Sequence, residues 1–170
     1  MTQILIVTIP LLILSVTTLL TIFGLMRSEQ KKRQLELILR DKANILPNRL
    51  QAYERIALFM ERISPESLIL REQNNAINCL VFHSILLKTI RTEYEHNIAM
   101  QIYLTPQTWK LVQTAKEEVI KLINATARET QPDLPSMEMG KSILASAPQT
   151  CQYHIKKALE AIQLEVQQLG

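Results

Sequence analysis

Apolar residues recur with a helical period along most of this chain. In residues 47–63 they cover about half of a helix circumference while charged residues take the other half, and Pro47 suits the first position of a helix. The apolar side chains in this stretch are Leu50, Tyr53, Ile56, Ala57, Phe59, Met60 and Ile63. Ser64 and Pro65 end the pattern, and the apolar run 68–70 is too short to distinguish a strand from a turn.

Two further helices are predicted in the middle of the chain. Residues 73–97 carry apolar side chains on almost every side, which predicts the buried central helix of a bundle. These side chains are Ile77, Leu80, Val81, Phe82, Ile85, Leu86 and Leu87. Thr105 and Pro106 form an N-cap and N1 pair that opens a helix to about residue 127. Its apolar arc consists of Trp109, Leu111, Val112, Ala115, Val119, Leu122 and Ile123. The pattern predicts an all-α fold with a helical core domain over residues 47–127.

The last part of the chain divides into a linker-like segment and an amphipathic helix. Residues 128–147 are rich in Pro, Ser and Ala, with room for one short helix. In residues 148–170 the apolar positions step by 4, 3, 4 and 3, as in a coiled-coil seam. The seam consists of Ile155, Leu159, Ile162, Val166 and Leu169. Two interpretations stay open: the seam binds a partner protein or a second copy, or the helix packs as the last helix of the same bundle.

The first 26 residues carry no charge, and residues 4–26 are mostly aliphatic. This length is enough for one helix to cross a bilayer. A retained anchor is favoured over a cleaved signal peptide, because the segment lacks a positive n-region and a small-residue cleavage site. Residues 27–46 predict a basic helical stem after the span. Because basic residues follow the span and none precede it, we expect the N-terminus outside and residues 27–170 in the cytoplasm.

The charge is concentrated in this stem. Residues 27–46 hold six basic and three acidic residues, which is the whole net charge of +3, whereas residues 47–170 hold thirteen of each. The stem therefore suits anionic lipid headgroups, and nucleic acid is not an expected partner. The basic residues nearest the span are Arg27, Lys31, Lys32 and Arg33. Three glycines in the chain are too few for a phosphate-cradling loop, and Cys79 and Cys151 are predicted to be reduced core residues.

A polar cluster ends the predicted helix 73–97. It consists of Arg91, Glu93, Glu95, His96 and Asn97. Glu93 and His96 have the i, i+3 spacing of carboxylate-bridged di-iron bundles, but such a site needs a second copy of the motif. Neither His83 nor His154 follows a glutamate three residues earlier. We therefore expect no metal, cofactor or catalytic residue here; the cluster is predicted to cap the helix or bridge to the next segment, and His83 to be a hydrogen-bonded core histidine.

Three stretches of the chain carry a resemblance to a known family. The sequences at 50–56, 61–68 and 90–97 resemble an uncharacterised family of small single-pass membrane proteins of Bacteroidota-type bacteria, over roughly residues 1–127. The resemblance implies a bacterial inner-membrane protein. It implies no activity and supplies no catalytic residues.

These observations predict a membrane-anchored cytoplasmic helical scaffold or accessory subunit of a larger inner-membrane complex, and not an enzyme. Two alternatives stay open. One is an enzyme or metal-binding protein that uses the cluster at residues 93–97. The other is a membrane tether for a ribosome or nucleic acid through the basic stem, which the neutral charge of residues 47–170 disfavours.

Overall fold

The computed structural model describes residues 45–169 and, before them, residues 18, 21–23, 26–27, 29–30 and 32–33. The described residues before position 34 are helical. Most of the predicted membrane span and stem lies outside the described residues. Among the residues that are described, no helix is long and apolar enough to cross a membrane. Residues Pro47–Gly170 form one compact unit, whose start coincides with the predicted start of the core domain.

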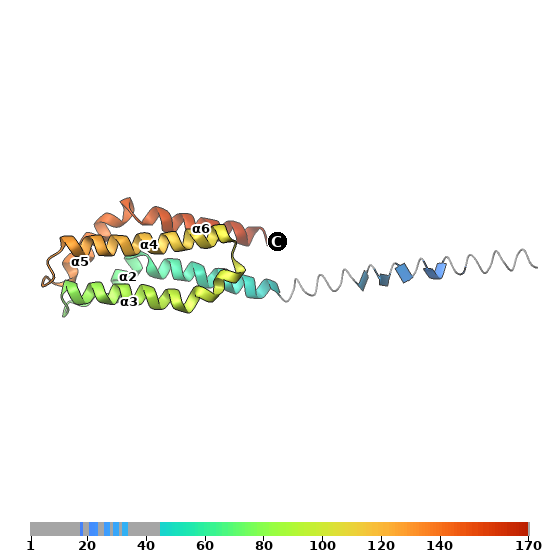
Figure 1. Ribbon diagram of the computed structural model, residues 1–170, viewed down its shortest axis with the longest axis horizontal. Helices are drawn as coiled ribbons and strands as arrows, with labels where there is room; N and C mark the ends of the chain where they lie inside the picture. Colours follow the sequence, from blue (N-terminus) through green and yellow to red (C-terminus); the bar gives the residue numbers. More distant parts are fainter. Residues whose placement is uncertain are drawn as a thin grey trace, which may run out of the picture. The chain divides into compact units, whose positions relative to one another are not determined.

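Four helical segments run alternately up and down in this unit, so the predicted all-α bundle is confirmed for the described residues (Figure 1). The first segment comprises helical residues 45–63 and α2 (Pro65–Glu72). The second is α3 (Cys79–Asn97) with the 3-10 helix η1 (Ile98–Tyr103), and the third is α4 (Pro106–Glu129). The fourth comprises α5 (Ser136–Ser146), the 3-10 helix η2 (Ala147–Gln149) and α6 (Gln152–Gln167). The apolar run 68–70 is thus helical, within α2.

Two of the four segments are interrupted by proline. Pro65 begins α2 directly after the helical residues 45–63, and Pro148 lies in η2 between α5 and α6. Proline has no backbone N–H and disfavours helical geometry in the residue before it, so each proline changes the direction of its segment. In the second and third segments the α-helices are not interrupted by proline, since Pro106 stands at the first position of α4.

Helix α4 contributes more of the core than α3 does. Of the predicted arc, Leu111 is partly buried and the other six residues are buried. Helix α4 packs against α3, α5 and α6. The prediction that residues 73–97 form a central helix buried on almost every side is wrong. The helix begins only at Cys79, capped by Asn78, and its Leu80 and Val81 are exposed. Its buried apolar side chains are Cys79, Phe82, Leu86 and Ile90, which form one face.

Residues 128–147, interpreted from composition as linker-like, hold helix α5 and contribute to the core. Ser136, Met139, Gly140 and Ile143 of α5 are buried. A Cβ added at Gly140 would lie 3.3 Å from Ile69 Cγ2, so glycine at this position lets α5 approach α2 closely. Hydrogen bonds from Cys79 N to the Leu134 carbonyl (2.8 Å) and from Ser136 N to the Ile77 carbonyl (3.1 Å) join the loops before α3 and α5. The segment is therefore an integral part of the bundle.

The seam of the last helix faces the bundle. Ile155 and Ile162 are buried, and Leu159, Val166 and Leu169 are partly buried against the same core. Helix α6 lies beside α4, as Figure 1 shows. The sequence left open whether this helix binds a partner or packs as the last helix of its own bundle. In the structure it packs against the core of its own bundle. Binding of a partner through this seam stays a prediction, since Leu159, Val166 and Leu169 are only partly buried.

Both cysteines are buried and free, as predicted. Burial raises the pKa of the Cys151 thiol, with a smaller opposing contribution from a hydrogen bond to Thr150. A buried thiol with a raised pKa is mostly protonated at neutral pH and is a poor nucleophile. Cys151 therefore acts as a small apolar core residue.

Candidate functional site

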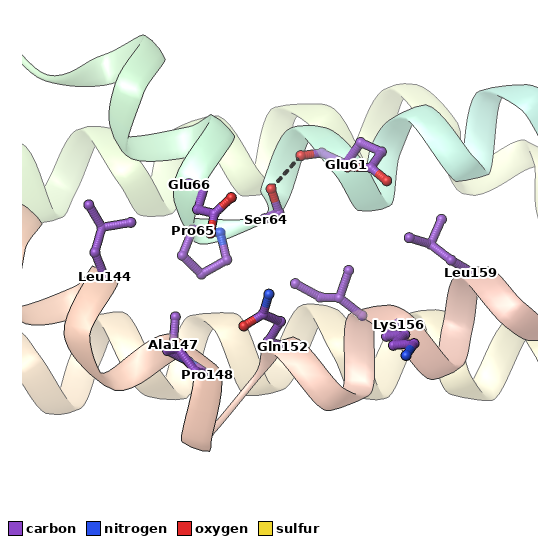
Figure 2. Close-up of a pocket in the computed structure, with 11 residues that line it drawn as sticks. Glu61, Ser64, Pro65, Glu66, Leu144, Ala147, Pro148, Gln152, Lys156 and Leu159 are labelled. Carbon is purple, nitrogen blue, oxygen red and sulfur yellow. Dashed lines mark hydrogen bonds between the residues drawn. The ribbon is translucent and has the colours of Figure 1, made fainter.

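An open groove lies where the two proline interruptions face each other (Figure 2). One wall comes from the end of the helical residues 45–63 and the start of α2, and the other from α5, η2 and α6. Pro65 and Pro148 lie on opposite walls. The groove thus lies beside the breaks between helices in the first and fourth segments. The volume of the groove is about 270 Å³.

The lining of the groove combines an apolar floor with charged edges. The apolar lining residues are Pro65, Leu144, Ala147, Pro148, Ile155 and Leu159. Glu61 and Glu66 supply two carboxylates on one wall, and Lys156 and Gln152 lie on the other. The Ser64 hydroxyl already has a hydrogen-bond partner, because it donates to the Glu61 backbone carbonyl at 2.8 Å. Such a lining suits an apolar side chain with a cationic neighbour, which would satisfy the two carboxylates.

The polar cluster predicted at the end of α3 is bridged to the first segment by two arginines. Arg62 Nη1 lies 3.1 Å from Glu93 Oε1 in an ion pair. Arg55 donates from Nη2 to the His96 carbonyl (3.0 Å) and from Nε to Asn97 Oδ1 (3.3 Å). Asn97 is buried and donates to the Glu93 carbonyl. Glu93, the His96 carbonyl and Asn97 therefore bridge α3 back to an earlier helix, whereas the sequence predicted a helix cap or a bridge to the next segment.

The remaining residues of the predicted polar cluster, and His83, are not arranged as metal ligands among the described residues. Arg91 and Glu95 are exposed on α3, and no group of three His, Cys, Asp or Glu residues suited to a metal ion occurs among the described residues. His83 Nε2 and Asn124 Oδ1 lie 2.8 Å apart, which links α3 to α4. His83 is hydrogen-bonded, as predicted, but only partly buried.

A polar network at the opposite end of the bundle from the loops before α3 and α5 was not predicted. The Tyr53 hydroxyl donates to Glu165 Oε2 (2.9 Å) and accepts from Arg49 Nη2 (3.0 Å). Thr105, the N-cap of α4, donates from its hydroxyl to Glu165 Oε1 (2.5 Å) and from its backbone N–H to the same carboxylate (3.3 Å). One carboxylate of α6 thus holds the start of α4 and the first segment together.

The electrostatics of this network favour an ionised Glu165. Burial by itself would raise the pKa of Glu165, but hydrogen bonds from Thr105, Thr108 and Tyr53 outweigh it and hold the pKa below its ordinary value. The pKa of Tyr53 is raised, chiefly by burial and further by Glu165, while Arg49 opposes the change. A neutral tyrosine and an ionised glutamate make a strong donor–acceptor pair, so the network fastens α6 to the start of α4 and to the first segment.

Sequence reasoning found half of this network. Thr105 was identified as a helix N-cap, and its hydroxyl does accept from Thr108 N. Tyr53 was placed on the apolar face, where its ring is buried. Sequence reasoning missed Glu165, which lies on α6 beside Val166 of the seam. Its carboxylate meets the start of α4 only because α6 runs back along α4, and no local pattern in the sequence indicates this.

Comparison with known proteins gives a family and no activity. The family model that matches is described as "Family of unknown function (DUF7935)" and covers residues 1–169. The chain belongs to this family. No curated protein and no solved structure matches the chain. Membership in the DUF7935 family confirms the predicted resemblance to an uncharacterised family; the bacterial source and the membrane location that the resemblance implied stay predictions.

Proposed function

We propose that this protein is a membrane-anchored helical scaffold or accessory subunit, which binds a segment of a partner protein in the groove between its first and fourth helical segments. In this proposal residues 4–26 anchor the chain in the bacterial inner membrane with the N-terminus outside. The bundle of residues 47–170 then lies in the cytoplasm, with the basic stem at anionic headgroups. The partner segment carries apolar side chains flanked by Lys or Arg.

The groove is the observation that carries this proposal. It is open, its floor is apolar and its volume is about 270 Å³, enough for the side chains of a short peptide segment. Leu144 is 39 % exposed at its edge although it belongs to a helix whose other face is buried. Glu61 and Glu66 are exposed and occur in none of the ion pairs found among the described residues. A cationic partner would therefore gain contacts that no side chain of the described residues supplies.

Site-specific crosslinking of the full chain in its native membrane tests the groove. A photoreactive benzoylphenylalanine at Gln152, which lines the groove, should crosslink a defined partner, and mass spectrometry should map the adduct to an apolar segment with Lys or Arg. The same residue at Gln163, which is exposed on α6 away from the groove, is the matched control. Equal adducts at both positions, or an adduct on a segment without cationic residues, would contradict the proposed site.

Paired substitutions measure what the groove contributes. Leu144→Glu should weaken co-purification of that partner in mild detergent by about tenfold or more, the usual cost of losing an interface anchor. Leu164→Glu makes the same change at an exposed residue of α6 outside the groove and should leave co-purification unchanged. Both variants should keep the helical circular dichroism of the wild type, because both positions are solvent-exposed.

The anchor is tested separately. The full chain should stay in the membrane fraction through an alkaline carbonate wash, and a cysteine added at the C-terminus should be shielded from impermeant reagents in intact cells. Efficient labelling without permeabilisation would overturn the cytoplasmic location but not the groove. Release by carbonate would overturn the anchor.

A further inference from the structure

A second hollow, lined by the bridged end of α3, presents more positive than negative charge. Its volume is about 210 Å³. The residues that line it are Arg55, Leu58, Phe59, Arg62, Glu93, His96 and Asn97. Two arginines thus approach one space from the same helix, seven residues and about two helical turns apart. The hollow shares no residue with the groove of Figure 2.

The arginines differ in how their charge is balanced. Arg62 pairs with Glu93, whose side chain is mostly buried. Arg55 has no carboxylate partner among the described residues, since its hydrogen bonds go to the His96 carbonyl and the Asn97 amide oxygen. These two bonds use Nε and Nη2 and fix the plane of the guanidinium, while Nη1 makes no hydrogen bond among the described residues. A guanidinium held in this way is prepared to bind an oxyanion at low entropic cost.

A third cation lies on the other side of Glu93. Lys88 lines a neighbouring hollow together with Thr89, Thr92 and the same Glu93. The two adjoining hollows therefore hold three cations, Arg55, Arg62 and Lys88, against one carboxylate. This balance disfavours a metal cation at the Glu93 and His96 pair. An anion with close to two negative charges would neutralise it, and a phosphate monoester carries between 1.5 and 2 at neutral pH.

We propose that the hollow lined by Arg55, Arg62 and His96 binds a phosphate monoester group. Leu58 is exposed at its rim, so the group carrying the phosphate has an apolar surface to contact. Both a free phosphate compound and a phospholipid headgroup have this chemistry. The site stands independently of the proposed groove, because it involves another face of the first segment and other residues.

Calorimetric titration of the detergent-solubilised full chain, at constant ionic strength, tests this site with two probes. Inorganic phosphate represents the free anion, and the soluble lipid dihexanoylphosphatidic acid represents the headgroup. Binding of both to the same degree assigns the site to free phosphate compounds, and binding of the lipid alone assigns it to a headgroup; either result supports the phosphate site. Failure of both probes to bind overturns it.

Charge-matched variants decide where the probe binds. Arg55→Gln and Arg62→Gln should each weaken binding by about tenfold or more, as expected for the loss of charge-assisted hydrogen bonds. Arg128→Gln removes an exposed arginine at the end of α4 and should bind like the wild type. Equal weakening in all three variants would mean diffuse attraction by surface charge and would overturn the site.

A second measurement, which needs only the conservative variant Arg55→Lys, covers the case in which the glutamine variants fail to fold. Arginine Nε–H signals in a nitrogen-15 NMR spectrum should shift for two arginines when inorganic phosphate or the lipid binds. Assignment by Arg55→Lys, which keeps the charge that Arg55 places beside Asn97, should remove one of the two shifted signals. Shifts confined to other arginines would contradict the proposal.

Discussion

Helices α3 and α4 pack side by side and are both rich in apolar residues, yet they use these residues differently. In α4 the apolar positions lie on one face, and buried residues follow this face from Thr108 to Thr126. In α3 the apolar positions surround the helix, and the bundle covers one face only. Apolar residues on one face therefore indicated burial correctly, whereas apolar residues on every side did not indicate a central helix.

The position of α3 in the bundle explains the difference. Its first turn lies at the end where the loops before α3 and α5 meet, and Leu80 N donates to the Pro132 carbonyl (3.2 Å). A loop backbone meets this turn, and the Leu80 side chain, at 59 % exposure, has no helix packed over it. Helix α4 has α3, α5 and α6 around it. Burial of an apolar residue thus depends on which neighbours reach its position in the bundle.

The largest expected effect follows from charging the buried face of α4. Val119→Asp should unfold the bundle or nearly so, because an unpaired buried carboxylate costs several kcal/mol against a total stability of about 5 to 15 kcal/mol. Thermal unfolding of the full chain in mild detergent, followed by circular dichroism, measures this. Ala125→Asp, on the exposed face of the same helix, is the control and should change the midpoint little. A fully folded Val119→Asp chain would contradict the assigned core.

The features that the sequence predicted are those with local causes. The N-cap at Thr105, the buried arc of α4 and the interruption at Pro65 each depend on residues within a few positions of one another. The features it missed depend on distant partners. The core role of α5 needs Ile69 beside Gly140, and the network at Glu165 needs the return of α6 along α4. Neither the groove nor the arginine hollow has a sequence motif, since their residues come from separate helices.

A smaller loss of stability is expected at the start of α4, where Thr105 donates hydrogen bonds to Glu165 of α6. Glu165→Gln should destabilise the chain by about 1 to 2 kcal/mol, because it removes the charge that strengthens the hydrogen bonds from Thr105 and Tyr53. Chemical unfolding at neutral pH measures the change. The matched control is Glu160→Gln, at an exposed glutamate of the same helix whose ion pair with Lys156 is 3.9 Å long.

The same network predicts a pH dependence of stability. The pKa of Glu165 is lower in the folded chain than its ordinary value of about 4.3, so the contribution of Glu165 is present in full above that value. It should decrease as the pH falls below about 4.3 towards the lower pKa of the folded state, since the unfolded chain then binds the proton more readily. The stability difference between wild type and Glu165→Gln should therefore shrink in acid. A difference that stays constant from neutral pH to pH 3 would show that the charge of Glu165 contributes nothing.

The smallest effect is expected at Leu80, the apolar position of α3 that sequence reasoning placed in the core. Leu80→Asp should change the free energy of unfolding by no more than about 0.5 kcal/mol, as is usual for exposed positions. The change can even be stabilising, because position 80 lies in the first turn of α3, where a negative charge interacts favourably with the helix dipole. Chemical unfolding beside Val119→Asp makes the contrast direct: the same carboxylate is added to neighbouring helices, and only the buried position should respond. Unfolding by Leu80→Asp would return α3 to the centre of the bundle and remove the distinction between the two helices.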